Sequence, residues 1–290
     1  TGTSDYGQGH WSTFAQIMHD RLGLPFEQID LVQKDSDRLI AGGGSGGSRS
    51  VMNSSMALLA AADEVETKAR QWAAHTLEAP EADLVLKEGA FEVVGTDRRV
   101  TLLEIARIAR ESPPVEGLPE DVDAELTVEG APSAYPNGVH YCELEVDPAT
   151  GVVALDRYVS VNDFGTIVNP MLTRGQIQGG IVQGIGQALY ENMVYDDEGQ
   201  LLSGSFMDYT LPRADGVPLI QVEFIEVPAT TNPLGAKGCG EAGATGAPPT
   251  VMNALLDALA PLGVTHLDMP ATPQVVWQAI HETQPAQAAE

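Results

Sequence analysis

The sequence predicts an α+β protein made of two packed α/β subdomains with mixed sheets. Helical and strand-like segments follow one another without strict βαβ alternation, which argues against a doubly wound sheet. Three glycine-rich segments each lead directly into a helix. The 290 residues, 43% of them hydrophobic, can bury a sizeable core in one large domain or two smaller ones.

The first subdomain is expected at residues 1–112. A polar glycine loop at 1–10 leads into a helix over 11–22, whose apolar residues share one face. A second glycine loop at 41–50 leads into a long helix near 51–77, which is rich in Ala, Leu and Glu. The other expected elements are a short strand at 29–32, a hairpin of 84–86 with 91–94, and a helix over 102–110.

Residues 113–136 are acidic and proline-rich, which favours a linker, and residues 137–282 form the second expected subdomain. The turn at 147–151 predicts an antiparallel hairpin. A third glycine loop at 235–246 precedes a helix expected to begin at Pro248, because proline suits a first helical turn. The other expected elements are strands at 138–146, 152–162 and 219–227, helices at 172–190, 248–260 and 273–281, and a disordered tail at 283–290.

Charge and cysteine content exclude several classes of function. Fifteen basic against 41 acidic residues give a formal net charge of −26, and no Lys/Arg cluster offers a nucleic-acid surface. We interpret the acid excess as a solvated surface. Cys142 and Cys239 form no CxxC pair, so an all-cysteine zinc or iron–sulfur site is not expected on this chain.

The expected location is the cytoplasm, with a periplasmic one left open. Low cysteine usage fits a reducing compartment, and no apolar run approaches membrane-spanning length, so no membrane partner is expected. The chain opens on Thr1 inside a motif, without a signal-peptide pattern. We therefore interpret it as a piece of a longer polypeptide.

A glycine loop before a helix can hold an anion. Missing side chains let a ligand approach the backbone, and the N–H groups of the first turn point towards it. Phosphate, pyrophosphate or a charged oxo group would fit, and a plain flexible connection is the alternative. Gly42, Gly44 and Gly47 match GxGxxG, but the strand candidate before them ends too early for a classical dinucleotide site. Lys237-Gly238-Cys239 lacks the Ser or Thr of a Walker loop.

Two glutamines and one glutamate are candidate site residues. Gln8 and Gln183 are flanked by glycines, which would present their amides beside exposed backbone. The alternative for Gln183 is the polar face of a helix packed closely through its glycines. Glu241 lies among small residues and would suit a tight, partly dry pocket as a general base. A helix cap or an exposed loop carboxylate is the alternative for Glu241.

Arg49, His10 and Cys239 are weaker candidates. Arg49 follows the second glycine loop, where it would pair bidentately with a phosphate, unless it is an ordinary exposed arginine. His10 is a lone histidine beside a helix start, which is more often structural than metal-ligating. Cys239 has no supporting His or Asp nearby in sequence, which favours a buried or incidental thiol over a nucleophile.

Five segments in order resemble the xanthine dehydrogenase/aldehyde oxidase family of molybdenum hydroxylases. They are residues 1–10, 42–50, 161–165 with 169–170, 175–180 with 182–186, and 235–243. They are most similar to bacterial large subunits of the carbon monoxide dehydrogenase or nicotinate/quinoline oxidoreductase type.

The resemblance implies the C-terminal, molybdopterin-binding half of such a large subunit. The reaction would hydroxylate an electron-poor carbon of an aldehyde, N-heterocycle or carbon monoxide-type substrate, with water as the oxygen source. The implied cofactor is molybdopterin cytosine dinucleotide, whose pterin dithiolene holds the molybdenum without a protein ligand. Glu241 matches the family's catalytic base. The residues implied at the cofactor are Gln8, Gly9, His10, Gly44, Ser45, Gly46, Gly47, Ser48, Arg49, Ser50, Gln183 and Gly240.

The resemblance also implies partners. These are the N-terminal half of the same large subunit, an iron–sulfur small subunit and an FAD medium subunit, with the clusters and the flavin on those subunits. The fragment alone is expected to be inactive, since half of the site is absent from it. Two rival functions are a Cys239-dependent hydrolase and a non-catalytic assembly domain.

Overall fold

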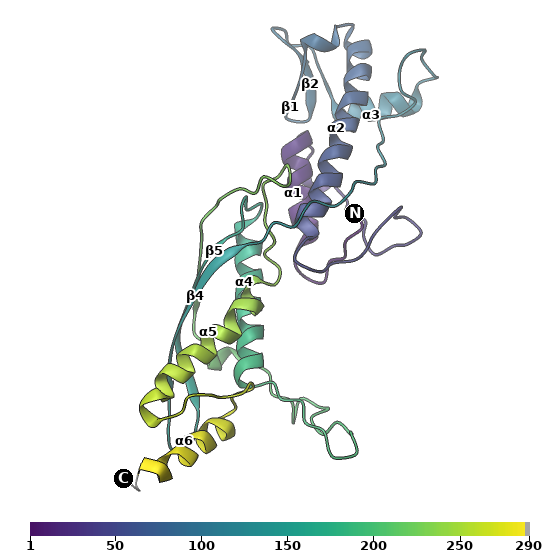
Figure 1. Cartoon of the computed structure of the whole chain (residues 1–290). Coiled ribbons are helices and arrows are strands. Elements are labelled where there is room, and N and C mark those ends of the chain that lie inside the picture. The colour runs from purple at the N-terminus through teal and green to yellow at the C-terminus, as the bar shows by residue number, and fades with distance from the viewer. Residues whose placement is uncertain (288–290) are drawn as a thin grey trace. The chain divides into compact units, whose positions relative to one another are not determined.

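The computed structural model describes residues 1–287, which divide into two compact units (Figure 1). Unit 1 contains Thr1–Ala134 and Pro228–Ala236. Unit 2 contains Tyr135–Val227 and the chain from Lys237 onward. The predicted α+β class is confirmed, because each unit combines helices with one small sheet.

Unit 1 is built around the long helix α2 and a three-stranded sheet of order β1-β2-β3, which is antiparallel throughout and not mixed. Its elements are α1 (His10–Leu22), η1 (Phe26–Gln28), α2 (Ser50–Leu77), η2 (Glu81–Asp83), β1 (Leu84–Lys87), β2 (Ala90–Val93), β3 (Arg99–Thr101) and α3 (Leu102–Glu111). Trp72 of α2, Phe91 of β2 and Ile105 of α3 meet in its core. Thr101 and Glu104 form a capping box that fixes the start of α3.

Two predictions in unit 1 are wrong. The strand expected at 29–32 does not form, and η1 lies just before these residues instead. Residues 113–134 are not a free linker, since Val122 is buried in the core of unit 1 and the indole of Trp72 donates to Pro119 O at 2.9 Å. The segment 113–134 is rich in proline and acidic residues, so its sequence gives little sign of the few apolar side chains that anchor it to the core.

Unit 2 places two helices against a mixed sheet of order β4-β5-β6, in which β5 pairs antiparallel with β4 and parallel with β6. Its elements are β4 (Asn137–Val146), β5 (Val153–Asp163), α4 (Pro170–Leu189), η3 (Ala214–Gly216), β6 (Ile220–Phe224), α5 (Ala242–Leu259), η4 (Ala260–Leu262) and α6 (Pro273–Gln287). Ile181 of α4, Leu255 of α5 and Tyr158 of β5 are fully buried in its core. Residues 283–287 are helical, contrary to the predicted disordered tail, and 288–290 lie outside the described residues.

Glycines set how closely α4 and α5 pack. A Cβ on Gly180 would lie 3.1 Å from Gly243 Cα, and a Cβ on Gly184 would lie 2.7 Å from the Ala247 side chain. The contact pairs rise together along both helices, so the two helices run in the same direction. Helix α5 begins at Ala242 and not at Pro248, because the small residues before the proline pack helically against α4.

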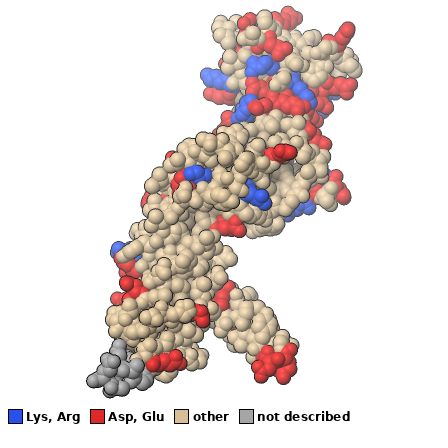
Figure 2. Space-filling view, viewed as in Figure 1, with Lys and Arg blue, Asp and Glu red and all other residues tan. Residues whose placement is uncertain are grey.

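No helix among residues 1–287 has the length and the apolar character needed to cross a membrane. Acidic side chains outnumber basic ones on the face shown in Figure 2. This agrees with the net charge of −26.

Candidate functional site

The N-terminal loop and the second glycine loop, far apart in sequence, are joined in unit 1. Gly2 O accepts hydrogen bonds from Gly43 N at 3.1 Å and from Gly44 N at 3.2 Å. The Ser45 hydroxyl accepts from Ser4 N at 3.0 Å and donates to Ser4 O at 2.6 Å. A Cβ on Gly2 would lie 2.5 Å from Ala41 O, so glycine is required for this approach. The structure thus brings together two of the segments that the sequence singled out.

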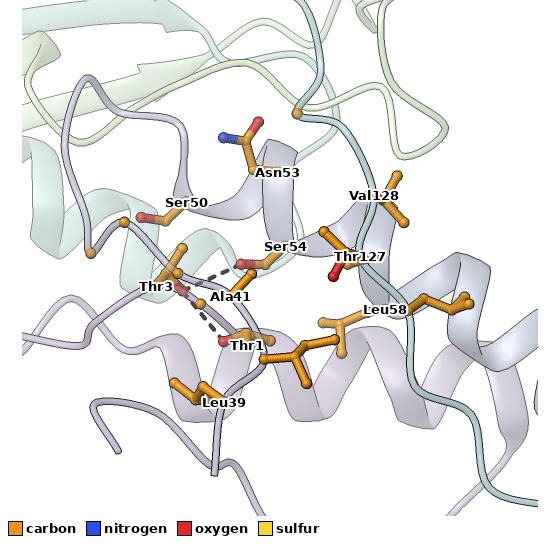
Figure 3. Close-up of a pocket in the computed structure, with 18 of the residues that line it drawn as sticks. Thr1, Thr3, Leu39, Ala41, Ser50, Asn53, Ser54, Leu58, Thr127 and Val128 are labelled. Atoms are coloured by element: carbon orange, nitrogen blue, oxygen red, sulfur yellow. Dashed lines mark hydrogen bonds between the residues drawn. The ribbon is translucent and has the colours of Figure 1, made fainter. Parts of the chain in front are cut away.

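A cleft of about 570 Å³ opens beside these loops (Figure 3). Its walls are the glycine loop, the start of α2 and the segment 124–130. Arg38 and Arg49 line it, against a single acidic residue, Glu125. In a chain with a net charge of −26, this local excess of positive charge favours an anionic ligand.

Backbone geometry makes the start of α2 accessible to such a ligand. The first N–H groups of any α-helix have no intrahelical partner. In α2 the N-cap residue is Arg49, whose side chain makes no capping hydrogen bond to them. Gly44 and Gly47 have φ of 72° and 62°, and Ser48 has φ of 56°. A Cβ on Gly46 would meet nothing within 4 Å, so this part of the loop borders open space.

Gln8 braces the N-terminal loop. Its Oε1 accepts from Tyr6 N, and its Nε2 donates to Ser4 O at 3.0 Å. Gly9, the N-cap of α1, has φ of 82°, which favours glycine. Both ends of the Gln8 amide are therefore engaged within the loop, and each keeps one further hydrogen-bonding position, a second N–H on Nε2 and a second lone pair on Oε1.

His10 lies inside unit 1. Its side chain packs on Phe14, its Nδ1 is 3.3 Å from Gln33 Nε2, and its backbone N donates to Asp5 Oδ2 at 3.0 Å. Burial lowers the pKa of His10, and the nearby Asp5 carboxylate opposes this only in part. The ring is thus a neutral packing group near pH 7.

Asn53 is a cleft residue that the sequence did not single out. It lies near the start of α2, and its Oδ1 is buried without a hydrogen-bond partner among the described residues. An unpaired buried acceptor costs about 1–3 kcal/mol. The same cleft contains Arg38, which sequence reasoning also missed because no motif includes it.

The loop that carries Glu241 lies in unit 2 and is fastened at both ends. Lys237 forms an ion pair with Asp163 in which the side chains are 12% and 13% exposed, and Lys237 N donates to Phe164 O at 2.8 Å. Gln176 of α4 donates to Gly240 O at 2.8 Å. The Gln176 contact was not predicted, because it joins residues 64 positions apart.

Glu241 is the N-cap of α5 and is exposed, so unit 2 alone does not form the dry pocket expected for it. Gln183 is also exposed. Gln176 contacts Gly240, and α4 runs in the same direction as α5, so residue 177 is level with Glu241. Gln183 lies six residues further along α4, which is about 9 Å along the helix axis. The two side chains therefore lie exposed at separate levels of unit 2.

Cys239 does not have the environment of a nucleophile. Burial raises the pKa of its thiol to about 11, which keeps it protonated near neutral pH. No group of three or more His, Cys, Asp or Glu side chains in residues 1–287 is arranged to hold a metal ion.

The chain is similar to known proteins over nearly its whole length. The chain belongs to the molybdopterin cofactor-binding domain family, whose model matches residues 1–218. Over 282 residues it is 39% identical to the carbon monoxide dehydrogenase large chain of Hydrogenophaga pseudoflava, covering 97% of this chain and 35% of that one. It is 37% identical over 282 residues to the nicotine 6-hydroxylase large subunit of Paenarthrobacter nicotinovorans, covering 96% and 35%.

Among solved structures, carbon monoxide dehydrogenase from Oligotropha carboxidovorans is similar, with a TM-score of 0.89 and 34% identity over 98% of this chain and 35% of that one. The resemblance to molybdenum hydroxylases is therefore confirmed as family membership. The chain spans about a third of the length of these relatives.

Proposed function

We propose that this chain binds molybdopterin cytosine dinucleotide within the large subunit of a molybdenum hydroxylase and supplies Glu241 as the general base. The observation that carries the proposal is the arginine-lined cleft at the uncapped start of α2. Membership of the molybdopterin cofactor-binding domain family supports the class of ligand.

The glycine loop and α2 would hold the pyrophosphate. The loop residues Gly44, Ser45, Gly46, Gly47, Ser48 and Ser50 would offer backbone N–H groups and hydroxyls. Arg49 and Arg38 would neutralise phosphate charge, as guanidinium groups do with paired donors. Within unit 1, Gln8, Gly9 and His10 are the residues that we propose at the pterin. Within unit 2, Gln183 and Gly240 are the proposed cofactor contacts.

When bound, the cofactor supplies the metal centre that receives the electrons taken from the substrate. Glu241 would accept, at its carboxylate, the proton that the attacking water must lose. The contacts of Lys237 with Asp163 and of Gln176 with Gly240 would hold this carboxylate in place. The remainder of the large subunit would exclude water from Glu241, since unit 2 leaves it exposed.

Partners follow from the same proposal. The relatives are named as a large chain and a large subunit, which supports assembly with further subunits. We propose the N-terminal half of the large subunit, an iron–sulfur small subunit and an FAD medium subunit as these partners, and the cytoplasm as the location. The substrate class is an electron-poor carbon in an aldehyde, N-heterocycle or carbon monoxide-type molecule.

Two variants of the complete enzyme test the two halves of the proposal. Arg49→Ala should lower the molybdenum and cytidine monophosphate content per subunit, because a phosphate loses its paired donor. Arg110→Ala is the control, since Arg110 is exposed and pairs with Asp123 outside the cleft. Equal cofactor content in both variants would refute the phosphate role.

Glu241→Gln should lower turnover by several orders of magnitude while the molybdenum content stays near that of the wild type, because only the proton acceptor is lost. Glu198→Gln, in an exposed turn of unit 2, is the control. Wild-type turnover in Glu241→Gln would show that another group is the base. A complete subunit that retains no molybdenum would favour the assembly-domain alternative.

A further inference from the structure

Asn53 Oδ1 is the one side-chain polar atom of the cleft wall that is buried and unpaired among the described residues. It is placed near the N-terminal end of α2, between Ser50 and the segment that carries Thr127 and Val128 (Figure 3). Part of the cleft lining is apolar and has no hydrogen-bonding side chains. This part includes Ala57, Leu58, Ala61, Leu126 and Val128.

Gly130 keeps the space beside this amide open. A Cβ on Gly130 would lie 3.2 Å from Asn53 Oδ1 and 3.4 Å from Asn53 Nδ2. Any larger residue would therefore crowd both polar atoms of the amide. Because χ2 of asparagine is broad, the amide can turn into the cleft when a ligand offers it partners.

The separation between the start of α2 and Asn53 matches the separation between the phosphate and the base of a nucleotide. Asn53 follows Ser50 by three residues, so it lies about one helical turn beyond the open start of α2. In a nucleotide, one ribose separates the base from its 5′-phosphate. A ligand whose pyrophosphate is held at the glycine loop would thus bring its base to the level of Asn53.

We propose that the Asn53 amide recognises the nucleobase of the dinucleotide cofactor. Oδ1 accepts a hydrogen bond from the exocyclic amino group of cytosine, and Nδ2 donates to the adjacent ring nitrogen, which is the complementary pattern of an amide. The apolar wall formed by Leu58 and Val128 covers the face of the ring. This inference rests on the proposed function, and it adds the residue that reads the base.

The test uses the complete large subunit from cells that cannot make molybdopterin, titrated calorimetrically with cytidine diphosphate and, separately, with inorganic pyrophosphate. Asn53→Leu should weaken cytidine diphosphate binding at least tenfold and leave pyrophosphate binding unchanged. Asn53→Asp, which keeps the shape but loses the donor, should weaken it to a similar extent. Thr67→Val, which removes an exposed hydroxyl of α2 outside the cleft, is the control and should bind both probes as the wild type does.

The outcomes separate this inference from the proposed function. If Asn53→Leu binds cytidine diphosphate as the wild type does, or loses affinity for pyrophosphate equally, Asn53 does not read the base. If the wild type binds neither probe, the proposed function itself fails, and the inference with it. Leucine replaces an unpaired polar group with an apolar one of similar shape, so Asn53→Leu should unfold in urea at no lower concentration than the wild type.

Discussion

Gly243 is the position where the account of unit 2 can be tested most sharply by a single methyl group. A Cβ on Gly243 would lie 2.5 Å from Ile177 O and 2.7 Å from Ile181 N. Both atoms belong to the backbone of α4, so neither can move aside as a flexible side chain would. Gly243→Ala therefore forces α4 and α5 apart at the level of Glu241.

The expected magnitude follows from two opposing effects. Overpacking of this kind costs typically 1–3 kcal/mol. Alanine in place of glycine inside a helix returns roughly 1 kcal/mol through its higher helix propensity. The cost less the return predicts that Gly243→Ala lowers the free energy of unfolding by about 0–2 kcal/mol. In the complete enzyme it should also reduce turnover, because Glu241 stands two residues before the displaced contact.

Gly179→Ala provides the matched control on the neighbouring helix. Gly179 is exposed in α4 and its Cβ would meet nothing within 4 Å, so only the helix propensity changes. This variant should be more stable than the wild type by about 0.5–1 kcal/mol. Urea unfolding followed by circular dichroism measures both variants. If the two variants shift the unfolding midpoint in the same direction, the close contact between α4 and α5 does not exist as described.

Three further outcomes are expected. Burial raises the pKa of Asp163, but Lys237 and backbone donors lower it more strongly, so the net shift is downward. The Asp163 carboxylate therefore stabilises the fold above the unfolded pKa near 4, and this contribution is lost as pH falls through the folded pKa. Asp163→Asn should accordingly lose less stability than the wild type between about pH 5 and 2. The pKa of His10 is lowered by burial, so its stabilisation is present above about pH 6.5 and lost as pH falls through the folded pKa; urea midpoints of His10→Gln should fall less than those of the wild type over this range. Because burial raises the pKa of Cys239 to about 11, iodoacetamide should modify it slowly at pH 7.5 and Cys239→Ala should retain turnover, whereas loss of turnover would support the hydrolase alternative.

The elements that the sequence predicted well are those whose signals are local. The apolar face of α1, the Ala, Leu and Glu content of α2, and the turn between β4 and β5 place these elements within a residue or two of where they lie. The strand β3 was missed because it has only three residues and leads straight into α3. Its pairing with β2, a tertiary contact, is what makes it a strand.

Site residues that belong to a sequence motif could be predicted, whereas site residues brought together only by folding could not. Glycine spacing identified the loops near Ser45 and Glu241. The contributions of Arg38, Asn53 and Gln176 depend on segments that meet only after folding. The dry pocket predicted for Glu241 is not formed by unit 2, because the small residues around it pack against α4 and do not cover the carboxylate.

The most direct test of the central claim is the molybdenum position in a crystal of the complete native large subunit, located by anomalous scattering. The account predicts pyrophosphate density against Ser45, Arg49 and Ser50, and the Glu241 carboxylate within hydrogen-bond reach, roughly 2.6–3.2 Å, of an atom bound to the metal. A molybdenum peak remote from Glu241, or a glycine loop at Ser45 without phosphate density, would contradict it.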